Sequence, residues 1–450
     1  MSYKIAIIGS GPSAFYAAQE IFKSEQTIAV DMFEKLPTPY GLLRGGVAPD
    51  HQQMKTISKS YDKIASHPNF RFFGNVTVGE SVSVDELTDR YHAVIIAIGA
   101  QTDRQLNIPG EDAIGSHTAT EFVAWYNGHP DYQSSIFDLS KRSAVIIGQG
   151  NVAVDVTRIL AKSTDELKQT DITNQAISIL ENSQLTDIYM IGRRGPAQAA
   201  CTELELKELA HIHNVNVQVH DDLVLSENDQ LEMDASSKVR KNIQQLTTIK
   251  ATGALDSARK TIHLMFYLTP VEIIKNGQNI QKIRFEKNKM QGDFGHQKAV
   301  PTGEFIDLDC DILFRSIGYR GVPLNGVPFD QKSATIPNQN GQVLEDNGNP
   351  CQKLFVTGWI KRGPSGVIGT NRSDSIETVR QCLASIESTS IAIDSDVQEL
   401  LELKNIRSIS FHDWKIIDEY EQAEGKRVGK PREKLTNIDD VFNVLNNGVA

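Results

Sequence analysis

The stretch KIAIIGSGPSA, residues 4–14, decides the fold of the first part of the chain. Residues 4–8 form a short apolar run without turn residues, which is typical of a buried parallel strand. Gly9, Gly11 and Ala14 follow with the spacing G-x-G-x-x-A, and a helical pattern begins at Ala14. This order predicts a dinucleotide-binding turn, in which Gly9 allows a tight bend and Gly11 lets a pyrophosphate approach the backbone. Ala14 lets the helix pack closely on the strand, and the helix N-terminus offers N–H groups to the phosphates.

A second strand is predicted at residues 27–33, and Glu34 follows it directly. A carboxylate at this position can accept hydrogen bonds from a ribose diol. Glycine-rich turns also occur for purely structural reasons, so the spacing alone is weak. The order of strand, glycines, helix, strand and acid is far more specific, and it predicts a site for an adenine dinucleotide.

The same spacing returns later in the chain, at residues 148–153 (GQGNVA), after a predicted strand at 143–147. The next strand, residues 187–191, is followed by Arg193 and Arg194 and has no acid at its end. A carboxylate there would repel a 2′-phosphate, whereas two guanidinium groups would bind it through charge-assisted bonds. The second site is therefore interpreted as an NADP(H) site, and the first as a site for a dinucleotide without a 2′-phosphate.

FAD is the dinucleotide that best explains the first site. Two nicotinamide sites in one chain would make little chemical sense outside a transhydrogenase, whereas a flavin can accept and store the electrons of a hydride. Residues 354–369 support this interpretation, because a strand, several glycines and a helix start return there and suit the flavin end of FAD.

The composition is that of an ordinary globular protein of two or three domains: 450 residues, 40% hydrophobic and 23% charged. Asp and Glu number 57 and Lys and Arg 46, and the net charge of −11 argues against a general nucleic-acid binder. No apolar run approaches the roughly 18 residues of a membrane span. The first strand begins directly after residue 3, so we expect no leader segment and a cytoplasmic location.

The four cysteines are expected to be reduced, structural thiols. None forms a C-x-x-C pair, and their spacing suits neither an iron–sulfur cluster nor a zinc site, so no metal is predicted. They are Cys201, Cys310, Cys351 and Cys382.

Other segments are assigned from their periodicity and composition. A helix is predicted at residues 52–66, a strand at 69–78, and a turn with a second short strand at 80–87. Residues 224–245 are highly polar and are expected at the surface. Residues 262–268 alternate between apolar and polar, as a half-exposed strand does.

The chain resembles the adrenodoxin-reductase-like ferredoxin–NADP reductases, a branch of the glutathione-reductase-type flavoproteins. Family members from mitochondria carry a targeting segment, and none is expected in this chain. The chain is therefore expected to be a bacterial-type member. The matching stretches are GSGPSAFYAA (9–18), PYGLLRGGVAPDH (39–51), FGNVTVG (73–79), AIGAQTDR (97–104), IPGE (108–111), GQGNVAVDVTRIL (148–160), IGRRGPAQAACTELELKEL (191–209), GWIKRGPSGVIGTN (358–371) and DWKIIDEYE (413–421).

The resemblance implies an α/β protein with two Rossmann-like dinucleotide-binding domains, the NADP domain being inserted into the FAD domain. Residues 1–107 and 321–450 would bind FAD and residues 108–320 would bind NADP. It implies a monomeric enzyme that passes a hydride from NADPH to FAD, and then single electrons to a ferredoxin or a flavodoxin.

Individual positions also carry over by resemblance. The implied FAD contacts are Ala14, Glu34, Leu42, Val78, Trp359, Gly366, Val367 and Ile368, beside the turn glycines Gly9 and Gly11. The implied NADP contacts are Gln149, Gly150, Asn151, Val152, Arg193, Arg194, Glu205 and Gly366.

The candidates for proton transfer, again by resemblance, are His51, Asp155 and Glu208. Hydride transfer itself depends on positioning rather than on acid–base help. A histidine after Pro-Asp can equally be a capping or packing residue, and carboxylates on helices are commonly solvated.

Three other interpretations have to be considered. A pyridine-nucleotide disulfide reductase would need a C-x-x-C pair, and the small-subunit type of glutamate synthase would carry cysteine-rich segments for iron–sulfur clusters. A non-enzymatic flavin-binding module would not need Arg193 and Arg194.

An acidic ferredoxin would need local positive charge on the reductase. The candidate docking cations are Arg44, Lys361, Arg362, Arg240 and Lys241.

Overall fold

The chain forms two compact units in the computed structural model, which describes residues 3–24, 26–220, 222–253, 255, 258–366, 368–387 and 395–447. One unit joins Met1–Thr102 with Tyr319–Ala450, and the other is Asp103–Gly318. The second unit is thus an insertion in the first. The sequence places the two boundaries at 107/108 and 320/321. The chain passes between the units twice, at β5 (Thr102–Asp103) and just before β15 (Tyr319–Arg320).

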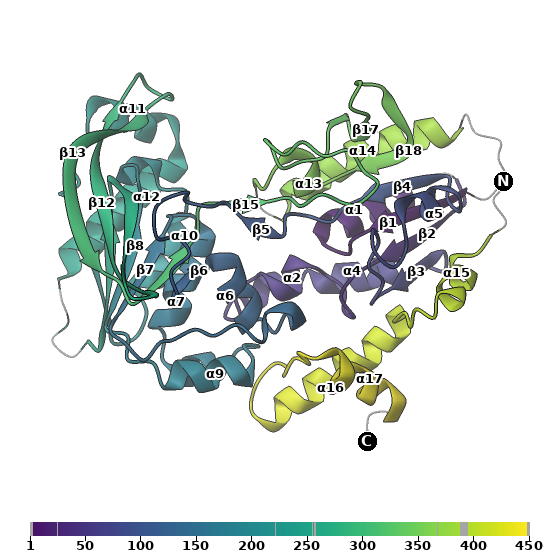
Figure 1. Ribbon diagram of the computed structural model, residues 1–450, viewed down its shortest axis with the longest axis horizontal. Helices are drawn as coiled ribbons and strands as arrows, with labels where there is room; N and C mark the ends of the chain where they lie inside the picture. Colours follow the sequence, from purple (N-terminus) through teal and green to yellow (C-terminus); the bar gives the residue numbers. More distant parts are fainter. Residues whose placement is uncertain are drawn as a thin grey trace. The chain divides into compact units, whose positions relative to one another are not determined.

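The first unit is built on a sheet that has seven strands within the described residues, in the order β16-β17-β18-β4-β1-β2-β3 (Figure 1). The strands from β18 to β3 are parallel, and β16 and β17 add an antiparallel edge. The strands are β1 (Tyr3–Ile8), β2 (Ile28–Phe33), β3 (Phe70–Phe73), β4 (Ala93–Ile96), β16 (Asn338–Gln339), β17 (Gln342–Leu344) and β18 (Pro350–Val356).

The apolar run of β1 lies in the middle of this sheet because its residues can be buried on both faces. β18 comes from the far end of the chain and pairs in parallel with β4. The helices of this unit are α1 (Pro12–Ile21), α2 (Leu42–Gly45), α3 (Gln52–Lys55), α4 (Ser58–Ala65), α5 (Val84–Thr88), α13 (Trp359–Arg362), α14 (Thr370–Glu387), α15 (Val397–Leu403), α16 (Phe411–Arg427) and α17 (Ile438–Asn447).

Three local predictions for the first unit are wrong. The helix at 52–66 is divided into α3 and α4, and the strand at 69–78 is limited to β3. The short strand at 80–87 is the helix α5. Ser83 caps α5: its hydroxyl accepts from the Glu86 N–H at 3.1 Å, while the Glu86 carboxylate accepts from the Ser83 N–H at 2.8 Å. This reciprocal cap favours a helix start where the sequence pattern indicated a strand.

The second unit contains a parallel sheet that, in the described part of the chain, has six strands in the order β6-β14-β7-β8-β10-β9 (Figure 1). A separate antiparallel sheet is formed by β11, β12 and β13. The strands are β6 (Ser116–Thr118), β7 (Ser143–Ile147), β8 (Asp187–Ile191), β9 (Val215–Val219), β10 (Lys260–Met265), β11 (Leu268–Asn276), β12 (Asn279–Gln291), β13 (Lys298–Asp309) and β14 (Ile312–Arg315).

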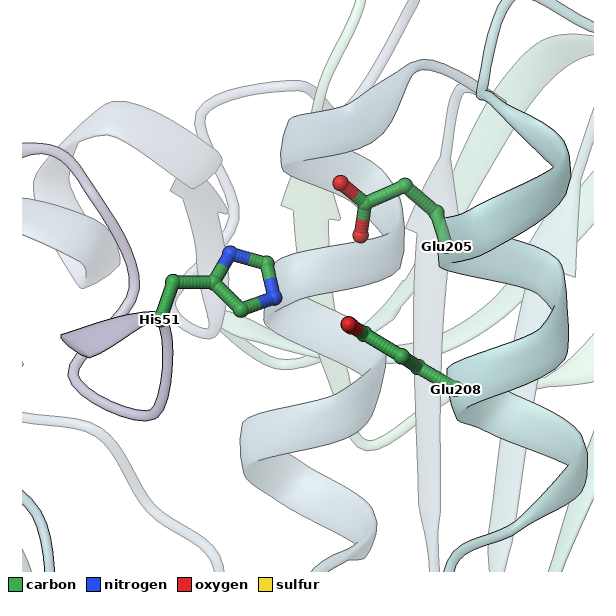
Figure 2. Close-up of side chains that lie close together, drawn as sticks. All are labelled: His51, Glu205 and Glu208. Carbon is green, nitrogen blue, oxygen red and sulfur yellow. The ribbon is translucent and has the colours of Figure 1, made fainter. Parts of the chain in front are cut away.

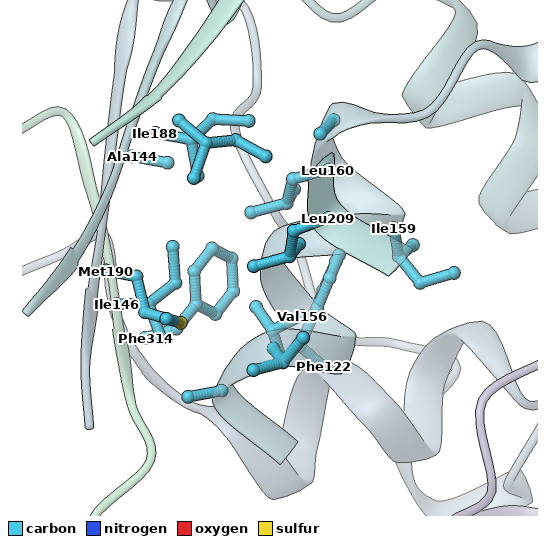
Figure 3. Close-up of a cluster of buried hydrophobic side chains, with 14 of the residues drawn as sticks. Phe122, Ala144, Ile146, Val156, Ile159, Leu160, Ile188, Met190, Leu209 and Phe314 are labelled. Atoms are coloured by element: carbon cyan, nitrogen blue, oxygen red, sulfur yellow. The ribbon is translucent and has the colours of Figure 1, made fainter. Parts of the chain in front are cut away.

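The main core of this unit lies between the parallel sheet and its helices (Figure 3). Ile146, Met190 and Phe314 project from the strands, and Val156 and Leu209 pack against them from two helices. This packing fixes the helix that starts after the second glycine-rich turn. The helices are α6 (Ala119–Tyr126), α7 (Asn151–Ala161), α8 (Thr164–Leu167), α9 (Asn174–Glu181), α10 (Glu203–Ala210), α11 (Glu227–Ala235) and α12 (Ser237–Thr252).

One prediction for the second unit is also wrong, and one is confirmed. The segment at 262–268 is not half-exposed: β10 lies between β8 and β9, and Ile262 and Leu264 are fully buried. The polar segment at 224–245 lies at the surface, as predicted. It forms α11 and the first part of α12, and its buried residues are Asp229, Asn242 and Ile243. None of the helices in the described residues combines the length and apolar character that a membrane span requires.

Candidate functional site

The first glycine-rich turn needs its two glycines for different reasons. Gly9 has φ +97°, and a Cβ at this position would lie 2.6 Å from the carbonyl oxygen of Ala97. Gly11 has an extended backbone, and no heavy atom of the described residues lies within 4 Å of its would-be Cβ. Gly9 is thus required by the fold, whereas the open space above Gly11 fits a ligand that approaches the backbone.

Both glycine-rich turns lead into a helix whose start is open. Gly11 is the N-cap of α1 and Gly150 the N-cap of α7, and among the described residues no side chain caps either helix. By contrast, α6, α9 and α10 are capped by the hydroxyl groups of Thr118, Thr173 and Thr202. The first N–H groups of α1 and α7 are therefore available to phosphate oxygens, as a dinucleotide site requires.

Glu34 stands at the end of β2, and its carboxylate is fixed beside the glycine turn. One carboxylate oxygen accepts from the Ser10 N–H at 3.0 Å and from the Ser10 hydroxyl at 2.6 Å. The other accepts from the Leu36 N–H at 3.0 Å. Burial raises the pKa of Glu34, although these hydrogen bonds act in the opposite direction. The Glu34 carboxylate is thus held next to the first glycine-rich turn, at the position where a dinucleotide-binding fold contacts a ribose.

Leu42 and Val78 both lie in the first unit. Leu42 has an accessible side chain, whereas Val78 has backbone groups that are unpaired in the described part of the chain. Leu42 opens the short helix α2, and its side chain is exposed. The Val78 side chain is buried in the core, while its own peptide N–H and C=O form no hydrogen bond with the described residues. This arrangement is compatible with an adenine edge that meets the backbone of Val78.

The late glycine-rich loop brings Trp359 and Gly366 into one short segment. Trp359 begins α13, and its indole N–H donates to the Ser365 carbonyl at 3.2 Å. Gly366 has φ +81°, and a Cβ there would lie 2.6 Å from the Thr370 hydroxyl oxygen. Gly366 therefore has a local conformational reason to be glycine, independent of any ligand.

The two remaining positions of this loop differ in what can be said of them. Ile368 is partly buried against the core of the first unit. Val367 lies outside the described residues.

The second glycine-rich turn repeats the geometry of the first. Gly148 has φ +135°, and its would-be Cβ would lie 2.1 Å from the Ser316 carbonyl oxygen. The corresponding space at Gly150 contains no atom of the described residues within 4 Å. The Gln149 carboxamide donates to the Met265 carbonyl at 2.9 Å, so this side chain stabilises the turn itself.

Two more predicted NADP contacts lie at the start of α7. The Asn151 side-chain oxygen accepts from the Thr202 N–H at 3.2 Å, which ties the starts of α7 and α10 together. Val152 is partly buried against the core. Both residues therefore hold the helix that presents the open N-terminus.

Arg193 and Arg194 follow β8, and their backbone is fixed while their side chains are exposed. The Asn288 amide donates to the Arg193 carbonyl at 2.9 Å, and the Tyr267 N–H donates to the Arg194 carbonyl at 3.1 Å. Neither guanidinium group forms a hydrogen bond or ion pair within the described part of the chain. Two unpaired cations on a fixed backbone suit an anionic ligand such as a 2′-phosphate.

The three acidic candidates of the second unit converge on one arginine. The Arg158 guanidinium lies 2.7 Å from Asp155, 3.2 Å from Glu205 and 3.2 Å from Glu208, with its side chain 1% exposed. Glu205 and Glu208 project from the same side of α10 (Figure 2). The three carboxylates are thus ion-paired rather than simply solvated. The i,i+3 spacing of Asp155 and Arg158 was the signal in the sequence.

His51 is the residue at the start of α3, but its side chain does not cap that helix. It is half-buried and is drawn in Figure 2. The capping interpretation of this histidine is therefore wrong, and its role in proton transfer stays a proposal.

Three of the five predicted docking cations are committed to partners inside the first unit. Arg44 binds the Glu421 carboxylate at 2.8 and 2.5 Å, and Arg362 binds the Asn371 side chain at 2.6 Å. Lys361 is only 7% exposed and lies 2.9 Å from Asp374. These partners do not fit the free positive charge that docking of an acidic ferredoxin was expected to need. Arg240 and Lys241, in α12, are exposed.

Comparison with known proteins places these features in context. The pyridine nucleotide-disulphide oxidoreductase family pattern matches residues 3–220. The chain is 43% identical to the NADPH-ferredoxin reductase FprA of Mycobacterium tuberculosis, over 98% of this chain and 99% of that protein. It is 40% identical to the mitochondrial NADPH:adrenodoxin oxidoreductase of Arabidopsis thaliana, over 97% of this chain and 94% of that one.

The solved structures agree with the sequence relatives. The structure of M. tuberculosis FprA in complex with NADPH is similar, with a TM-score of 0.92 and 41% identity, and covers 99% of both chains. The two Rossmann-like folds predicted from the glycine-rich turns are confirmed by this similarity and by the two parallel sheets.

Proposed function

The chain belongs to the family of NADPH-ferredoxin reductases and NADPH:adrenodoxin oxidoreductases, and we propose that it transfers electrons from NADPH through FAD to an iron–sulfur protein. The observation that carries this proposal is the opposite charge at two otherwise equivalent positions. Glu34 ends the second strand of the first fold, and Arg193 and Arg194 follow the second strand of the other. One chain thus offers a site for an adenine dinucleotide without a 2′-phosphate and a site for NADPH.

FAD, when bound, accepts a hydride from NADPH and releases its electrons one at a time to an iron–sulfur cluster. The residues of this chain bind and orient the two dinucleotides. The open N-termini of α1 and α7 hold the pyrophosphates, Glu34 accepts from a ribose diol, and the two arginines bind the 2′-phosphate. Leu42, Val78, Trp359 and Ile368 are the further residues that we propose for FAD.

We propose that Gln149, Asn151 and Val152 form the wall of the NADP site, and that Glu205 belongs to it. His51, Asp155 and Glu208 remain our candidates for handling a proton. The carboxylates of Asp155 and Glu208 are ion-paired with Arg158, at 2.7 and 3.2 Å.

Disulfide chemistry is not supported by the cysteines. All four are buried and unpaired, and burial raises the pKa of each thiol, that of Cys201 to about 11. The reactive form of cysteine is the thiolate, which these environments disfavour. A flavodoxin as alternative acceptor, a monomeric state and a cytoplasmic location stay predictions from the sequence.

Anaerobic titration of the purified, FAD-reconstituted protein with NADPH tests the proposal. We expect the flavin absorbance to bleach at one equivalent of NADPH, and the protein to reduce a ferredoxin under steady-state conditions. NADH should be a much poorer donor because it lacks the 2′-phosphate. A protein that binds no FAD, or that binds FAD but is not reduced by NADPH, would contradict the proposal.

A further inference from the structure

The turn at Tyr40–Gly45 lies directly against the first glycine-rich turn. A Cβ on Gly41 would lie 2.9 Å from the Gly11 Cα, and the Tyr40 N–H donates to the Ser10 carbonyl at 3.0 Å. Tyr40 itself has φ +87°, a conformation that is rare and strained for an aromatic residue. Such a conformation persists only where surrounding contacts enforce it, and it is often found at ligand clamps.

One set of contacts that enforce this conformation comes from α16, near the C-terminus. The indole N–H of Trp414 donates to the Tyr40 hydroxyl at 3.2 Å, and the two rings pack edge to face at 5.7 Å. The Tyr40 hydroxyl in turn donates to Asp62. Tyr40 and Trp414 are both buried, so the hydroxyl group of Tyr40 depends on these partners in place of water.

The second contact is a buried ion pair between the same turn and the same helix. The Glu421 side chain is 0% exposed, and its carboxylate accepts two hydrogen bonds from Arg44, at 2.8 and 2.5 Å. Glu421 also binds Arg432 at 3.1 Å and the Leu435 N–H at 2.9 Å. The Arg44 guanidinium lies 5.1 Å from the centre of the Trp414 ring.

A buried carboxylate is strongly unfavourable without a cation, and Glu421 is paired with two, Arg44 from the turn and Arg432 from its own segment. Bidentate geometry fixes direction as well as distance. If the C-terminal segment served only to cover the core, apolar contacts such as those of Ile417 and Val441 would be sufficient. The polar contacts of Trp414 and Glu421 instead select one position of the turn beside Gly11.

We propose that the C-terminal segment, residues 410–435, is a positioning element of the first dinucleotide site. Through Trp414 and Glu421 it holds the strained turn at Tyr40–Gly45 in the conformation that borders Gly11. It thereby sets how tightly the protein retains its dinucleotide. The inference rests on the proposed function only in that FAD is the dinucleotide bound at Gly11.

FAD uptake by the full-length apoprotein tests this, measured as quenching of flavin fluorescence. Glu421→Gln keeps the shape of the side chain and removes its charge. We expect it to raise the dissociation constant of FAD by about tenfold or more. Trp414→Phe keeps an aromatic ring and removes the N–H that binds Tyr40, and it should raise the constant by about threefold to tenfold. If Glu421→Gln does not fold, Trp414→Phe decides the question.

Val441→Ala is the matched control, because it removes only apolar contacts of a buried residue in the adjoining helix α17. It should lower the melting temperature of the apoprotein while leaving FAD affinity within about twofold. Equal loss of affinity in the control and in the two test variants would overturn the inference, and so would unchanged affinity in both test variants. A wild-type apoprotein that takes up no FAD would instead contradict the proposed function itself.

Discussion

The two Rossmann-like folds of this chain have similar backbone conformations at their glycine-rich turns and differ at the end of the second strand. In each fold a buried strand ends in a glycine with positive φ, a second glycine opens a helix without a capping side chain, and space is left above that glycine. At the end of the following strand, however, Glu34 is held by Ser10 and Leu36, whereas Arg193 and Arg194 are exposed.

This difference separates two tasks that are easily confused. The phosphate site is made by backbone geometry, which is nearly the same in both folds and recognises any pyrophosphate. We propose that the charge at the tip of the second strand selects the cofactor. The fixed carboxylate of Glu34 would accept from a ribose diol, and the exposed Arg193 and Arg194 would bind a 2′-phosphate.

The largest expected effect follows from removing the arginine pair. Arg193→Ala with Arg194→Ala should lower kcat/KM for NADPH by a factor of about a hundred or more. The lost interaction free energy is about 3–6 kcal/mol, since each charge-assisted bond contributes about 1.5–3 kcal/mol. The kcat/KM for NADH should change little. Steady-state reduction of a dye with each donor measures both.

Arg240→Ala with Lys241→Ala is the control for this variant. It removes two exposed cations from the same unit, and dye reduction by NADPH should be unchanged. If the arginine variant loses NADH and NADPH activity equally, the assignment of the 2′-phosphate to Arg193 and Arg194 is wrong.

The glycines of the first turn should separate folding from binding. Gly11→Val adds a side chain to open space, so the apoprotein should keep its melting temperature while its FAD affinity falls by about tenfold to a hundredfold. Gly9→Ala should lower the melting temperature instead, because its Cβ would meet Ala97 at a positive φ. Thermal unfolding followed by circular dichroism and FAD titration gives both quantities. An unstable Gly11→Val apoprotein would refute the view that this position serves the ligand.

A smaller effect is expected from the titration of Glu34. Its pKa is raised by burial, so the carboxyl group becomes protonated at a higher pH than in a solvated glutamate. A ribose diol donates more strongly to the ionised form, so FAD binding favours the deprotonated acid. FAD affinity should be greatest above the raised pKa and should fall by about fivefold as the pH drops through it.

The second fold supplies the contrast for this titration. Arginine stays charged over the whole range. The pH dependence of NADPH affinity should therefore follow only the second ionisation of the 2′-phosphate, at about pH 6. Glu34→Gln should abolish the step in FAD affinity. A step that persists in this variant would show that another group is responsible.

The sequence predicted the parts of the fold that depend on short-range rules. The glycine spacing, the apolar runs of β1 and β7, and the residues after β2 and β8 all follow from what a βαβ unit requires. The burial of β10 could not be predicted in this way, because it depends on pairing with β8 and β9 from distant segments. The helix α5 could have been predicted from the capping pair Ser83 and Glu86.

The candidate site was less predictable, because the partners of charged side chains come from far along the chain. Arg44 resembled a docking cation until its pairing with Glu421, 377 residues later, was known. Gly366 has a similar lesson. The resemblance implies that Gly366 contacts both cofactors, yet φ +81° and the contact with Thr370 already require glycine. Gly366→Val would therefore disturb the loop itself and would not report on hydride transfer.

The smallest expected effect concerns the acceptor, and it again contrasts the two units. Arg44, Lys361 and Arg362 bind side chains within the first unit. Arg240 and Lys241 are exposed cations of the second unit, and the Arg240 guanidinium donates to the backbone carbonyls of Met233 and Asp234. An acidic ferredoxin would be attracted by the latter pair through long-range fields, which salt screens over about 10 Å at 0.1 M. Arg240→Ala with Lys241→Ala should therefore slow ferredoxin reduction by about twofold to threefold at low salt, and hardly at all at high salt.

Dye reduction by NADPH separates this docking effect from damage to the enzyme, because a small dye does not depend on the same field. Lys168→Ala is the matched control, since Lys168 is an exposed lysine of the second unit that is already paired with Glu181 at 2.9 Å. Its local field is largely cancelled by its partner, so ferredoxin reduction should be unchanged at every salt concentration. If Lys168→Ala slows ferredoxin reduction as much as the double variant does, the effect follows from total charge. In that case exposure and pairing would not select the docking cations, and the contrast between the two units would not extend to the acceptor.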